Sequence, residues 1–488
     1  MTRLGLAAIA AALIALPACT RKFEPPARAL TVEAPRNWSA SEASPGVMQE
    51  DWWAAFGDRG LDQAISEAMT RNHDLRAAAS RIEAAQSEAR IAGAALQPNV
   101  DVSVSRGRQR QNFVGLPIPG REDSVLSTTY TTAGLGLNLS WEADVWGRIK
   151  SNQIAAVANV EGRQADLAGA RLSLQGQTAK AWFGAIEAQK QLAVARDTLE
   201  SYQVSAERVR ARFERGLRPS LDLRLALTEV SAAEALLEQR RLQLDAAIRQ
   251  LEVMLGRYPS GGYALAEDLP GVPSAVPAGL PAELVHRRPD LVAAERGLLA
   301  ADARIEQAKA ELRPRFRLTS GTGTASNQLK DLLNNDLFVW NFLGNFVQPL
   351  FNGGRLKAEV ARNEAQAREA AALYESALLR AYGEVETALA AENLLAERER
   401  ALEAATAQSL AARDLAEQRY QAGLADIITV LSSQRAALDA ESQLIAVRRM
   451  RLENRIDLHL ALGGGFEMRS FATPARITQA ADGKEPAT

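Results

Sequence analysis

An internal duplication constrains the fold of this chain more than any other feature. Residues 74–98 match residues 290–314 without a gap, at a constant offset of 216. Further along, the offset becomes 207, so that Gly216-Leu217 matches Gly423-Leu424. The change in offset means that the first copy carries nine extra residues, all before Gly147. A duplicated unit of this size predicts one architecture with internal pseudo-symmetry.

Composition excludes several classes of protein. The 488 residues carry a formal net charge of −2, which gives no strong field toward nucleic acid or anionic lipid. Aromatic residues are only 5% of the chain, and alanine is abundant. Such a chain is suited to close helix–helix packing rather than to bulky cores. A single cysteine excludes a disulfide framework.

The lone cysteine ends an N-terminal export signal. Arg3 precedes an apolar run over 4–16, which leads into Leu-Pro-Ala-Cys ending at Cys19. The run is short for a bilayer span. This pattern resembles a bacterial lipobox and predicts that Cys19 carries a covalent lipid, the only bound group that we expect. Thr20, rather than Asp, fits sorting to the outer membrane. The alternative is an ordinary signal peptide with a chance cysteine.

Each copy is predicted to hold a helix, two strands and a long helical hairpin. Apolar and small residues recur at three and four positions before Pro98, which ends the first helix. Alternation then indicates strands, and a proline-free stretch indicates a helix roughly 100 Å long. The elements predicted for the first copy are a helix over about 60–96, strands over about 100–105 and 135–141, a loop with glycines and prolines over about 107–120, a helix over about 149–213 and a return helix over about 221–255.

The second copy repeats this order. No proline occurs between Pro349 and Pro474, which favours an unbroken helical hairpin there. The predicted elements are a helix over about 282–312, strands near 316–319 and 339–350, a helix over 355–421 and a return helix over about 427–462.

Each chain is predicted to contribute four strands, which are too few to close a β-barrel on their own. One apolar face suits a barrel wall between lipid and water. Four strands cannot close, and an open sheet edge is not tolerated in hydrocarbon. Known closed barrels have about eight strands or more, so the chain must oligomerise if these strands cross a membrane. The alternative is a soluble four-stranded sheet that caps the helices.

Motifs along both copies resemble one family, the TolC- and OprM-like outer-membrane efflux channels. The match covers nearly the whole mature chain in order, and its nearest branch is the lipoprotein channels of resistance-nodulation-division (RND) pumps. The motifs are Trp52-Trp53 with Phe56, Asp58 and Leu61; Trp146-Gly147-Arg148 and Gly353-Gly354-Arg355; Arg287-Arg288-Pro289-Asp290-Leu291 with Ala294-Glu295; and Arg419-Tyr420 with Gly423-Leu424.

The resemblance implies a fold class that is mainly α with a membrane β-barrel. Three chains would supply four strands each to a twelve-stranded barrel, and the long antiparallel helices would form a trimeric α-barrel. The implied organisation is a signal peptide (1–18), a lipidated tether and equatorial segment (19–58), the first repeat (59–258), a linker (259–281), the second repeat (282–463) and an equatorial C-terminal segment with a disordered tail (464–488).

The resemblance also implies a function and partners. The chain would be the passive exit duct of a tripartite efflux pump, anchored in the outer membrane and extending into the periplasm. A homotrimer would contact outer-membrane lipid, a periplasmic adaptor and an inner-membrane RND transporter, and no nucleic acid. Alternatives are the same fold in type I protein secretion or metal-ion efflux, or a non-channel structural lipoprotein.

The ends of the two helical hairpins are the candidate sites. The family's apolar, acidic and basic constriction positions fall on Ile428, Ser432 and Arg435. Ser432 departs from the pattern. Arg435 is expected to pair with an acid or a backbone carbonyl on a neighbouring helix, and the candidates include Asp222 and Asp426. The implied adaptor-contact residues are Arg212, Gly216, Leu217, Arg419, Gly423 and Leu424.

Nothing in the pattern predicts catalysis or metal binding. His73, His286 and His459 lie far apart and are expected to be surface or capping residues. No glycine-rich loop for phosphate is present. We therefore expect no enzyme, no metal and no nucleotide.

Overall fold

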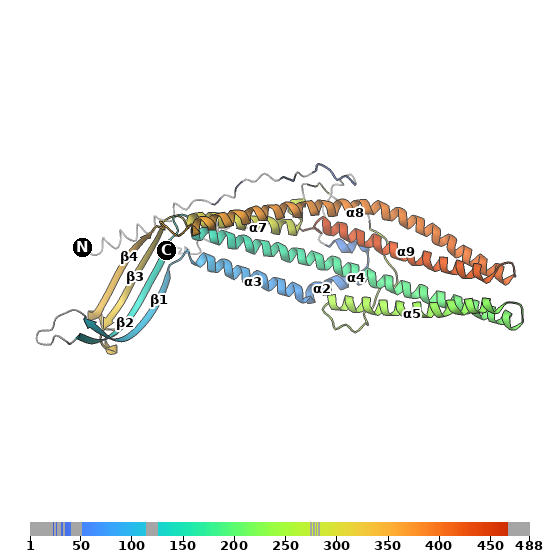
Figure 1. Ribbon diagram of the computed structural model, residues 1–488, viewed down its shortest axis with the longest axis horizontal. Helices are drawn as coiled ribbons and strands as arrows, with labels where there is room; N and C mark the ends of the chain where they lie inside the picture. The colour runs from blue at the N-terminus through green and yellow to red at the C-terminus, as the bar shows by residue number, and fades with distance from the viewer. Residues whose placement is uncertain are drawn as a thin grey trace, which may run out of the picture. The chain divides into compact units, whose positions relative to one another are not determined.

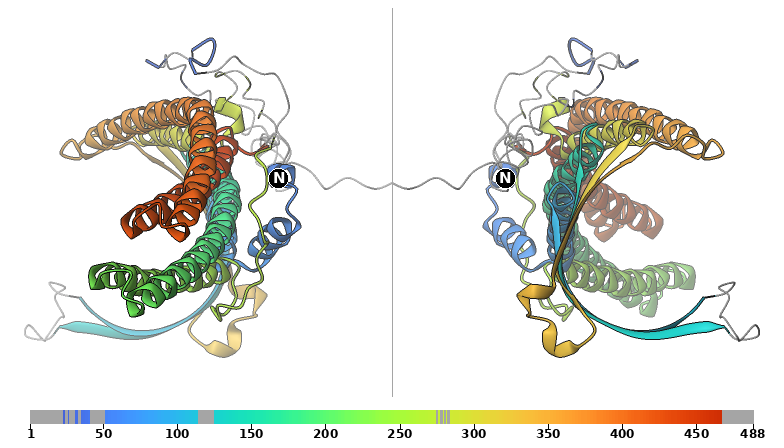
Figure 2. Two further views of the ribbon diagram at one scale, coloured as in Figure 1. Left: turned by 90° about the vertical axis from the view of Figure 1, so that its right-hand side faces the viewer. Right: turned by 90° about the vertical axis from the view of Figure 1, so that its left-hand side faces the viewer.

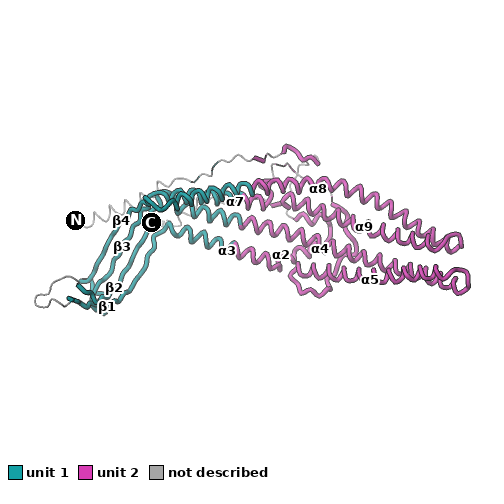
Figure 3. Tube along the Cα trace, in the orientation of Figure 1, with its two compact units in different colours: residues 1–29, 82–162, 295–373 teal, residues 30–81, 163–294, 374–488 magenta. Residues whose placement is uncertain are grey.

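A computed structural model describes residues 23, 26, 31–32, 35–40, 51–113, 125–273, 276, 279, 281 and 284–466. Cys19 and Thr20, the signal peptide and the tail beyond residue 466 lie outside the described residues. Contacts divide the chain into two units, and both repeats contribute to each of them (Figure 3). Unit 1 comprises residues 1–29, 82–162 and 295–373, and unit 2 comprises residues 30–81, 163–294 and 374–488.

Three pairs of equivalent helices in the two repeats have equal lengths, which confirms the duplication in structure. The first repeat contains α3 (His73–Ala94), α4 (Arg148–Glu214) and α5 (Ser220–Met254), and the second contains α7 (Pro289–Ala310), α8 (Arg355–Gln421) and α9 (Ile427–Ala461). Their lengths are 22, 67 and 35 residues in both repeats. The predicted hairpin helices are confirmed within about two residues, the scatter expected at helix ends.

The first helix of each repeat is broken, whereas one continuous helix is expected from the sequence. α2 (Arg59–Arg71) ends at Asn72, and the short α6 (Leu284–Arg287) ends at Arg288. Asn72 is extended, and its side-chain oxygen accepts from the backbone N–H groups of Asp74 and Leu75, which starts α3. Pro289 favours the break at Arg288, since it disfavours helix in the preceding residue.

The two breaks are equivalent, and each contacts the return helix of its own repeat. Asn72 Nδ2 donates to the carbonyl of Met254 at 3.4 Å, and Arg288 Nη1 donates to that of Ala461 at 3.1 Å. Offsets of 216 and 207 relate the members of the two pairs. The interruption is therefore a duplicated junction that docks the helix onto the end of the hairpin.

Four antiparallel strands form one sheet in the order β1-β2-β3-β4, with β1 and β4 at its edges. The strands are β1 (Asn99–Phe113), β2 (Leu126–Ala143), β3 (Arg315–Ser326) and β4 (Phe338–Val347), and Figure 2 shows that they curve along their length. β1 extends eight residues beyond the predicted end of its strand, because Ser105 to Phe113 remain paired with β2. The predicted loop over 107–120 is therefore wrong for residues 107–113, where polar residues on both faces leave no apolar alternation.

The register gives the sheet one apolar and one polar face. Directly paired residues point to the same side, and Val104, Leu135, Thr324 and Phe338 form one such row. The apolar face carries Val100, Val102, Val104, Leu135, Leu137, Leu139, Phe338, Trp340, Phe342 and Phe346. The polar face carries Asp101, Ser103, Asn138, Gly321 and Asn341 in its middle, and Asn138 donates to Ser103 across it.

Several small apolar clusters take the place of a single large core. In unit 2, Trp52, Phe56, Trp182 and Phe183 pack with the start of α2, and Asp58 caps that helix and accepts from Trp182 Nε1 at 2.7 Å. In unit 1, α4 and α7 meet through alanines such as Ala155 and Ala303. The expectation of alanine-based helix seams is thus confirmed. Within the described parts of the chain, no helix is both long and apolar enough to cross a membrane.

Candidate gate and docking tips

The two hairpin turns have the same construction. Gly216 and Gly423 adopt left-handed backbone angles, with φ of 70° and 75°. Leu217 N–H bonds the carbonyl of Arg212 at 2.9 Å, and Leu424 N–H bonds that of Arg419 at 2.8 Å. These bonds satisfy carbonyls at the helix ends, and glycine removes the steric cost of the turn. The leucines that follow are 68% and 71% exposed, so each tip presents an apolar side chain.

The two tips of one chain are joined by an arginine clamp at the ends of α4, α5, α8 and α9, which Figure 1 shows as two hairpins. Arg212 donates to the carbonyls of Tyr420 at 2.9 Å and Gln421 at 2.8 Å. Its guanidinium also lies 4.8 Å from the centre of the Tyr420 ring, and that of Arg218 lies 5.4 Å from it. In the part of the chain that the structure describes, Arg419 makes no equivalent bond. The clamp therefore breaks the internal symmetry.

The three predicted gate residues share one exposed stripe of α9. Ile428, Ser432 and Arg435 follow at intervals of four and three, which places them on one helix face, and all three are exposed. Ile428 is 60% exposed, although its neighbours Ile427 and Val430 are almost fully buried. Ser432 donates to the carbonyl of Thr429 at 3.0 Å. The stripe is thus a solvent-exposed face of α9 within a single chain.

Arg435 is paired, although with neither of the expected acids. Its Nε donates to Glu229 Oε2 at 2.9 Å, and its Nη2 contacts Oε1 of the same carboxylate. Asp426 instead caps α9 by accepting from Thr429 N–H at 2.8 Å. The expected pairing with an acid on a neighbouring helix is therefore confirmed, and the named candidates Asp222 and Asp426 are wrong. Sequence reasoning missed Glu229 because it lies a third of the way along α5, more than two turns past the hairpin tip.

The ion pair sits on a buried tyrosine. Burial raises the pKa of Tyr202 to about 12, and the negative charge of Glu229 adds to the rise. Hydrogen bonding and the charge of Glu229 raise the pKa of Arg435 above its usual range. Tyr202 is 3% exposed and belongs to the cluster that joins the two hairpins. The Arg435–Glu229 ion pair thus connects the exposed stripe of α9 to the buried cluster that contains Tyr202.

A second polar contact involves Gln434, the residue directly before Arg435 in α9. Gln434 is 3% exposed, and its Nε2 lies 2.9 and 3.0 Å from the hydroxyls of Ser201 and Ser205 and 3.0 Å from Glu417 Oε1. This amide joins α4 and α8 to α9, because buried polar groups require partners. Gln434 was not predicted from the sequence. It could have been noticed there, because a glutamine occupies a position at which the helical period predicts an apolar residue.

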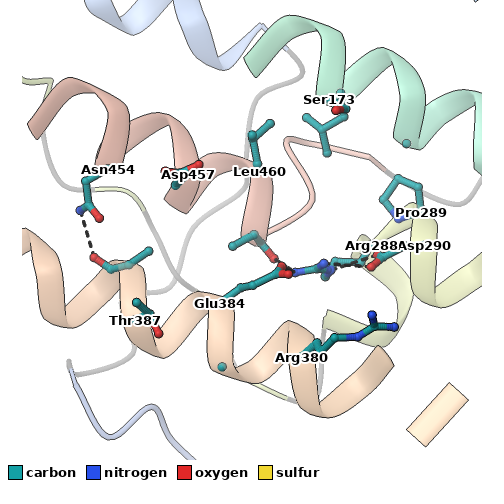
Figure 4. A pocket seen from close by; sticks show the side chains of 15 residues that line it. Ser173, Arg288, Pro289, Asp290, Arg380, Glu384, Thr387, Asn454, Asp457 and Leu460 are labelled. Atoms are coloured by element: carbon teal, nitrogen blue, oxygen red, sulfur yellow. Dashed lines mark hydrogen bonds and ion pairs between the residues drawn. The ribbon is translucent and has the colours of Figure 1, made fainter. Parts of the chain in front are cut away.

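The mid-chain signature has a structural role at the second-repeat junction (Figure 4). Arg288 is 8% exposed and bonds Asp290 at 3.0 and 2.9 Å and Glu384 at 2.6 Å. These bonds raise the pKa of Arg288 despite its burial, and the guanidinium lowers the pKa of Asp290 despite the burial of that carboxyl. A cavity of about 770 Å³ adjoins the cluster. Arg288 therefore fixes α7, α8 and the end of α9 together.

One histidine departs from expectation. His459 is 8% exposed and stacks on Trp52 with ring centres 5.1 Å apart, so the expected surface position is wrong. Burial, and secondarily the charge of Arg455, lower its pKa to about 4. Among the described residues, no group of three or more His, Cys, Asp or Glu side chains could hold a metal. The residue is thus a neutral packing element.

Long helical hairpins with matched tips and a free-edged sheet define the class of outer-membrane efflux proteins. The family model "Outer membrane efflux protein" matches residues 64–257 and 280–464, and the chain belongs to this family. The expected family, the mainly α, internally duplicated fold with four strands, and the general function of outer-membrane efflux are confirmed.

Relatives and solved structures cover nearly the whole chain. It is 31% identical over 464 residues to the pyoverdine export outer membrane protein OpmQ of Pseudomonas putida, covering 94% of this chain and 97% of that protein. It is 30% identical over 441 residues to the cation efflux system protein CusC of Escherichia coli, covering 89% of this chain and 93% of that protein. The structure of the outer-membrane channel OprN superposes with a TM-score of 0.83 at 26% identity, covering 91% of this chain and 98% of that one.

Proposed function

We propose that the chain is the gated exit duct of a tripartite efflux pump and works as a homotrimer. The observation that carries the proposal is the exposed stripe of Ile428, Ser432 and Arg435 beside the tip of the second hairpin. Three copies of this stripe, related by a three-fold axis, would narrow the periplasmic end. Transport through such a duct needs no catalytic group, and none is assigned.

The trimer is supported by the sheet. The outer edges of β1 and β4 have no partner among the described strands, and open edges are excluded from hydrocarbon. Pairing β1 of one copy with β4 of the next would give a twelve-stranded barrel with the apolar face outward. Mass measurement of the detergent-solubilised protein under native conditions tests this assembly. A conducting monomer would contradict it.

The gate is tested by single-channel conductance of the purified channel in planar bilayers. Ile428→Ala is expected to widen the constriction, and Arg435→Ala to loosen the stripe from α5. Arg435→Ala leaves the nearly buried Glu229 carboxylate without its counter-charge. A resulting shift of about 1 kcal/mol in the closed–open balance would raise the open population roughly fivefold. Unchanged conductance in the Ile428→Ala, Arg435→Ala double variant would show that the constriction lies elsewhere. Leu394→Ala, an exposed change on the middle of α8, is the control.

The exposed tip residues Leu217 and Leu424 would contact a periplasmic adaptor, and an inner-membrane RND transporter would supply energy and select cargo. The exposed leucines and the clamped turns support this docking role. Pull-down of the purified adaptor by wild-type and Leu217→Ser, Leu424→Ser channels tests it. Equal capture by both would contradict the docking role.

Cys19 is proposed to carry a covalent lipid that adds to anchoring in the outer membrane. Its place at the end of the apolar N-terminal run supports this. Labelling with a radioactive fatty acid should mark the wild type and not Cys19→Ser, while the trimer persists in both. An equally labelled Cys19→Ser variant would refute the lipid assignment.

Metal-ion efflux is the second candidate, because CusC, named as a cation efflux system protein, matches most of the chain. Export assays of a strain that lacks the native channel, with an organic antibiotic and with copper or silver ions, distinguish the two cargo classes. Sensitivity to metal alone would favour this second candidate.

A further inference from the structure

The apolar face of β1 changes abruptly to arginine. Val100, Val102 and Val104 point to this face, and the next three residues on the same face are Arg106, Arg108 and Arg110. Contacts confirm the face, because Arg110 donates to the Ser127 hydroxyl at 2.8 Å across the strand pair. At about 3.3 Å per residue, the three arginines span roughly 13 Å of the strand. We name them the arginine ladder.

Along β1, the arginine ladder directly follows the apolar part of the same face. Val104 lies in the same row as Leu135, Thr324 and Phe338, and Phe338 is the first residue of β4. The ladder therefore begins one paired row beyond the aromatic end of the band. β1 follows the helix α3 and β2 leads into α4, so this end of the sheet is the one distant from the helical connections.

No carboxylate balances the ladder on its own face. Within the four described strands, the other residues on this face are apolar, glycine, serine, threonine or asparagine. The acidic strand residues Asp101 and Glu142 point to the opposite face, where Glu142 pairs with Arg317. Among described residues, no ion pair includes Arg106, Arg108 or Arg110. Within the described part of the chain, no carboxylate therefore offsets the three charges.

We propose that the arginine ladder binds the phosphates of the phosphorylated glycolipid in the outer leaflet of the membrane. This inference rests on the proposed barrel, which would turn the apolar face toward lipid with the ladder at its outer rim. Charge on a lipid-facing strand is costly at the membrane centre and nearly free at the interface. Guanidinium matches phosphate with two parallel hydrogen bonds. Three such groups in a row complement a leaflet of phosphate-bearing lipids.

A neighbouring copy complements the ladder less well. In the proposed trimer β1 would pair with β4 of another copy, whose residues on this face are four aromatics and a glycine. Asp336, just before β4, is the nearest acid along that strand direction, and one carboxylate cannot match three guanidiniums. The experiment below also detects an ion pair between copies.

The test uses the full-length assembly in detergent and measures bound lipid by native mass spectrometry. The probes are diphosphoryl lipid A, its dephosphorylated counterpart and phosphatidylglycerol. The variant replaces Arg106, Arg108 and Arg110 with Gln, and the control replaces three exposed arginines of α8, Arg368, Arg398 and Arg400, with Gln. Both variants lose the same charge, and only the first loses the ladder.

Of the three lipids, wild type and control are expected to bind diphosphoryl lipid A most tightly. The affinity for this lipid should fall as the salt concentration rises. Each arginine near an anionic surface contributes about fivefold, so the ladder variant should bind on the order of a hundredfold more weakly. If the triple variant does not assemble, each single Arg→Gln variant is expected to lose about fivefold.

Three results would overturn the proposal. One is equal binding by wild type and ladder variant, and another is equal binding of dephosphorylated lipid or phosphatidylglycerol. The third is loss of the trimer both in the ladder variant and in Asp336→Asn, while lipid binding by these variants is unchanged. That result would show that the arginine ladder contacts a neighbouring copy. Conductance recorded on the same preparations separates these results from failure of the channel function, because a ladder variant that conducts normally leaves that function intact.

Discussion

Arg435 on α9 and Glu229 on α5 form a two-point ion pair whose members differ sharply in exposure. The Arg435 side chain is 61% exposed, and that of Glu229 is 9% exposed. Removing either partner therefore has different consequences. Without Glu229 the guanidinium is hydrated by water, whereas without Arg435 a nearly buried carboxylate loses its counter-charge.

Arg435→Ala should accordingly destabilise the hairpin end more than Glu229→Ala. Leaving a charged group buried and unpaired costs about 1–3 kcal/mol, and losing an exposed pair costs about 1 kcal/mol or less. The double variant should be less destabilised than Arg435→Ala alone. Hydrogen exchange of residues 425–440 measures the effect. Equal protection in the two single variants would show that Glu229 is already well hydrated.

Arg212 and Arg419 occupy equivalent positions and make different contacts, which gives a matched pair of variants. Arg212→Ala removes two bonds to the second hairpin and a cation–π contact. We expect faster hydrogen exchange at both tips and a loss of about 1–3 kcal/mol in local stability. Arg419→Ala should change local exchange by less than about 0.5 kcal/mol. Identical exchange in the two variants would mean that the clamp adds nothing to the stability of the tips.

Gly463, which follows the return helix α9, and Gly423, which follows the long helix α8 at the hairpin tip, give a comparison that tests the duplicated junction. Gly463 has φ of 91°, and a Cβ there would lie 1.9 Å from the Arg287 carbonyl oxygen. Gly423 has φ of 75° and no atom within 4 Å of such a Cβ. Gly463→Ala combines backbone strain with overlap and should cost about 2–5 kcal/mol. Gly423→Ala carries strain alone and should cost about 1–2 kcal/mol.

The measurement is the apparent thermal midpoint of the purified trimer at one fixed scan rate. Gly256→Ala should fall between the other two glycine variants, since its Cβ would lie 3.0 Å from the Arg71 carbonyl oxygen. A Gly463→Ala midpoint no lower than that of Gly423→Ala would contradict the close approach at the junction.

The sequence predicted the parts of this fold that follow from periodicity and failed where tertiary contacts decide. The hairpin helices end at Gly216 and Gly423, whose left-handed angles are local properties, so their limits were foreseeable. The break at Asn72 was not, because its side chain satisfies the start of α3 and a carbonyl 182 residues away. The length of β1 depends on pairing with β2, which polar residues do not reveal.

The candidate site shows the same division. The stripe of Ile428, Ser432 and Arg435 could be placed because it follows a recognisable turn and a helical spacing. The partner Glu229 could not, because choosing among acids on a facing helix requires the register of α5 against α9. Gln434 was overlooked for a related reason, since its partners Ser201 and Glu417 come from two other helices.

His459 gives a prediction for the pH dependence of stability. Its pKa is about 4 in the folded protein, against an ordinary histidine value of 6.5, and the main cause is burial against Trp52. The unfolded chain therefore binds the proton more readily. The stability that the neutral ring contributes is complete above pH 6.5 and is lost as pH falls from 6.5 toward 4, on the order of 1–3 kcal/mol.

His459→Phe keeps an aromatic ring against Trp52 and removes the titrating group, so its thermal midpoint should fall less between pH 7 and pH 4.5 than that of the wild type. Carboxylates that lose ion pairs in acid contribute to both proteins equally and cancel in the comparison. His73→Phe, which changes an exposed histidine at the start of α3, should keep the wild-type pH dependence. Parallel curves for His459→Phe and wild type would mean that water reaches the ring in the folded state and that burial does not lower its pKa.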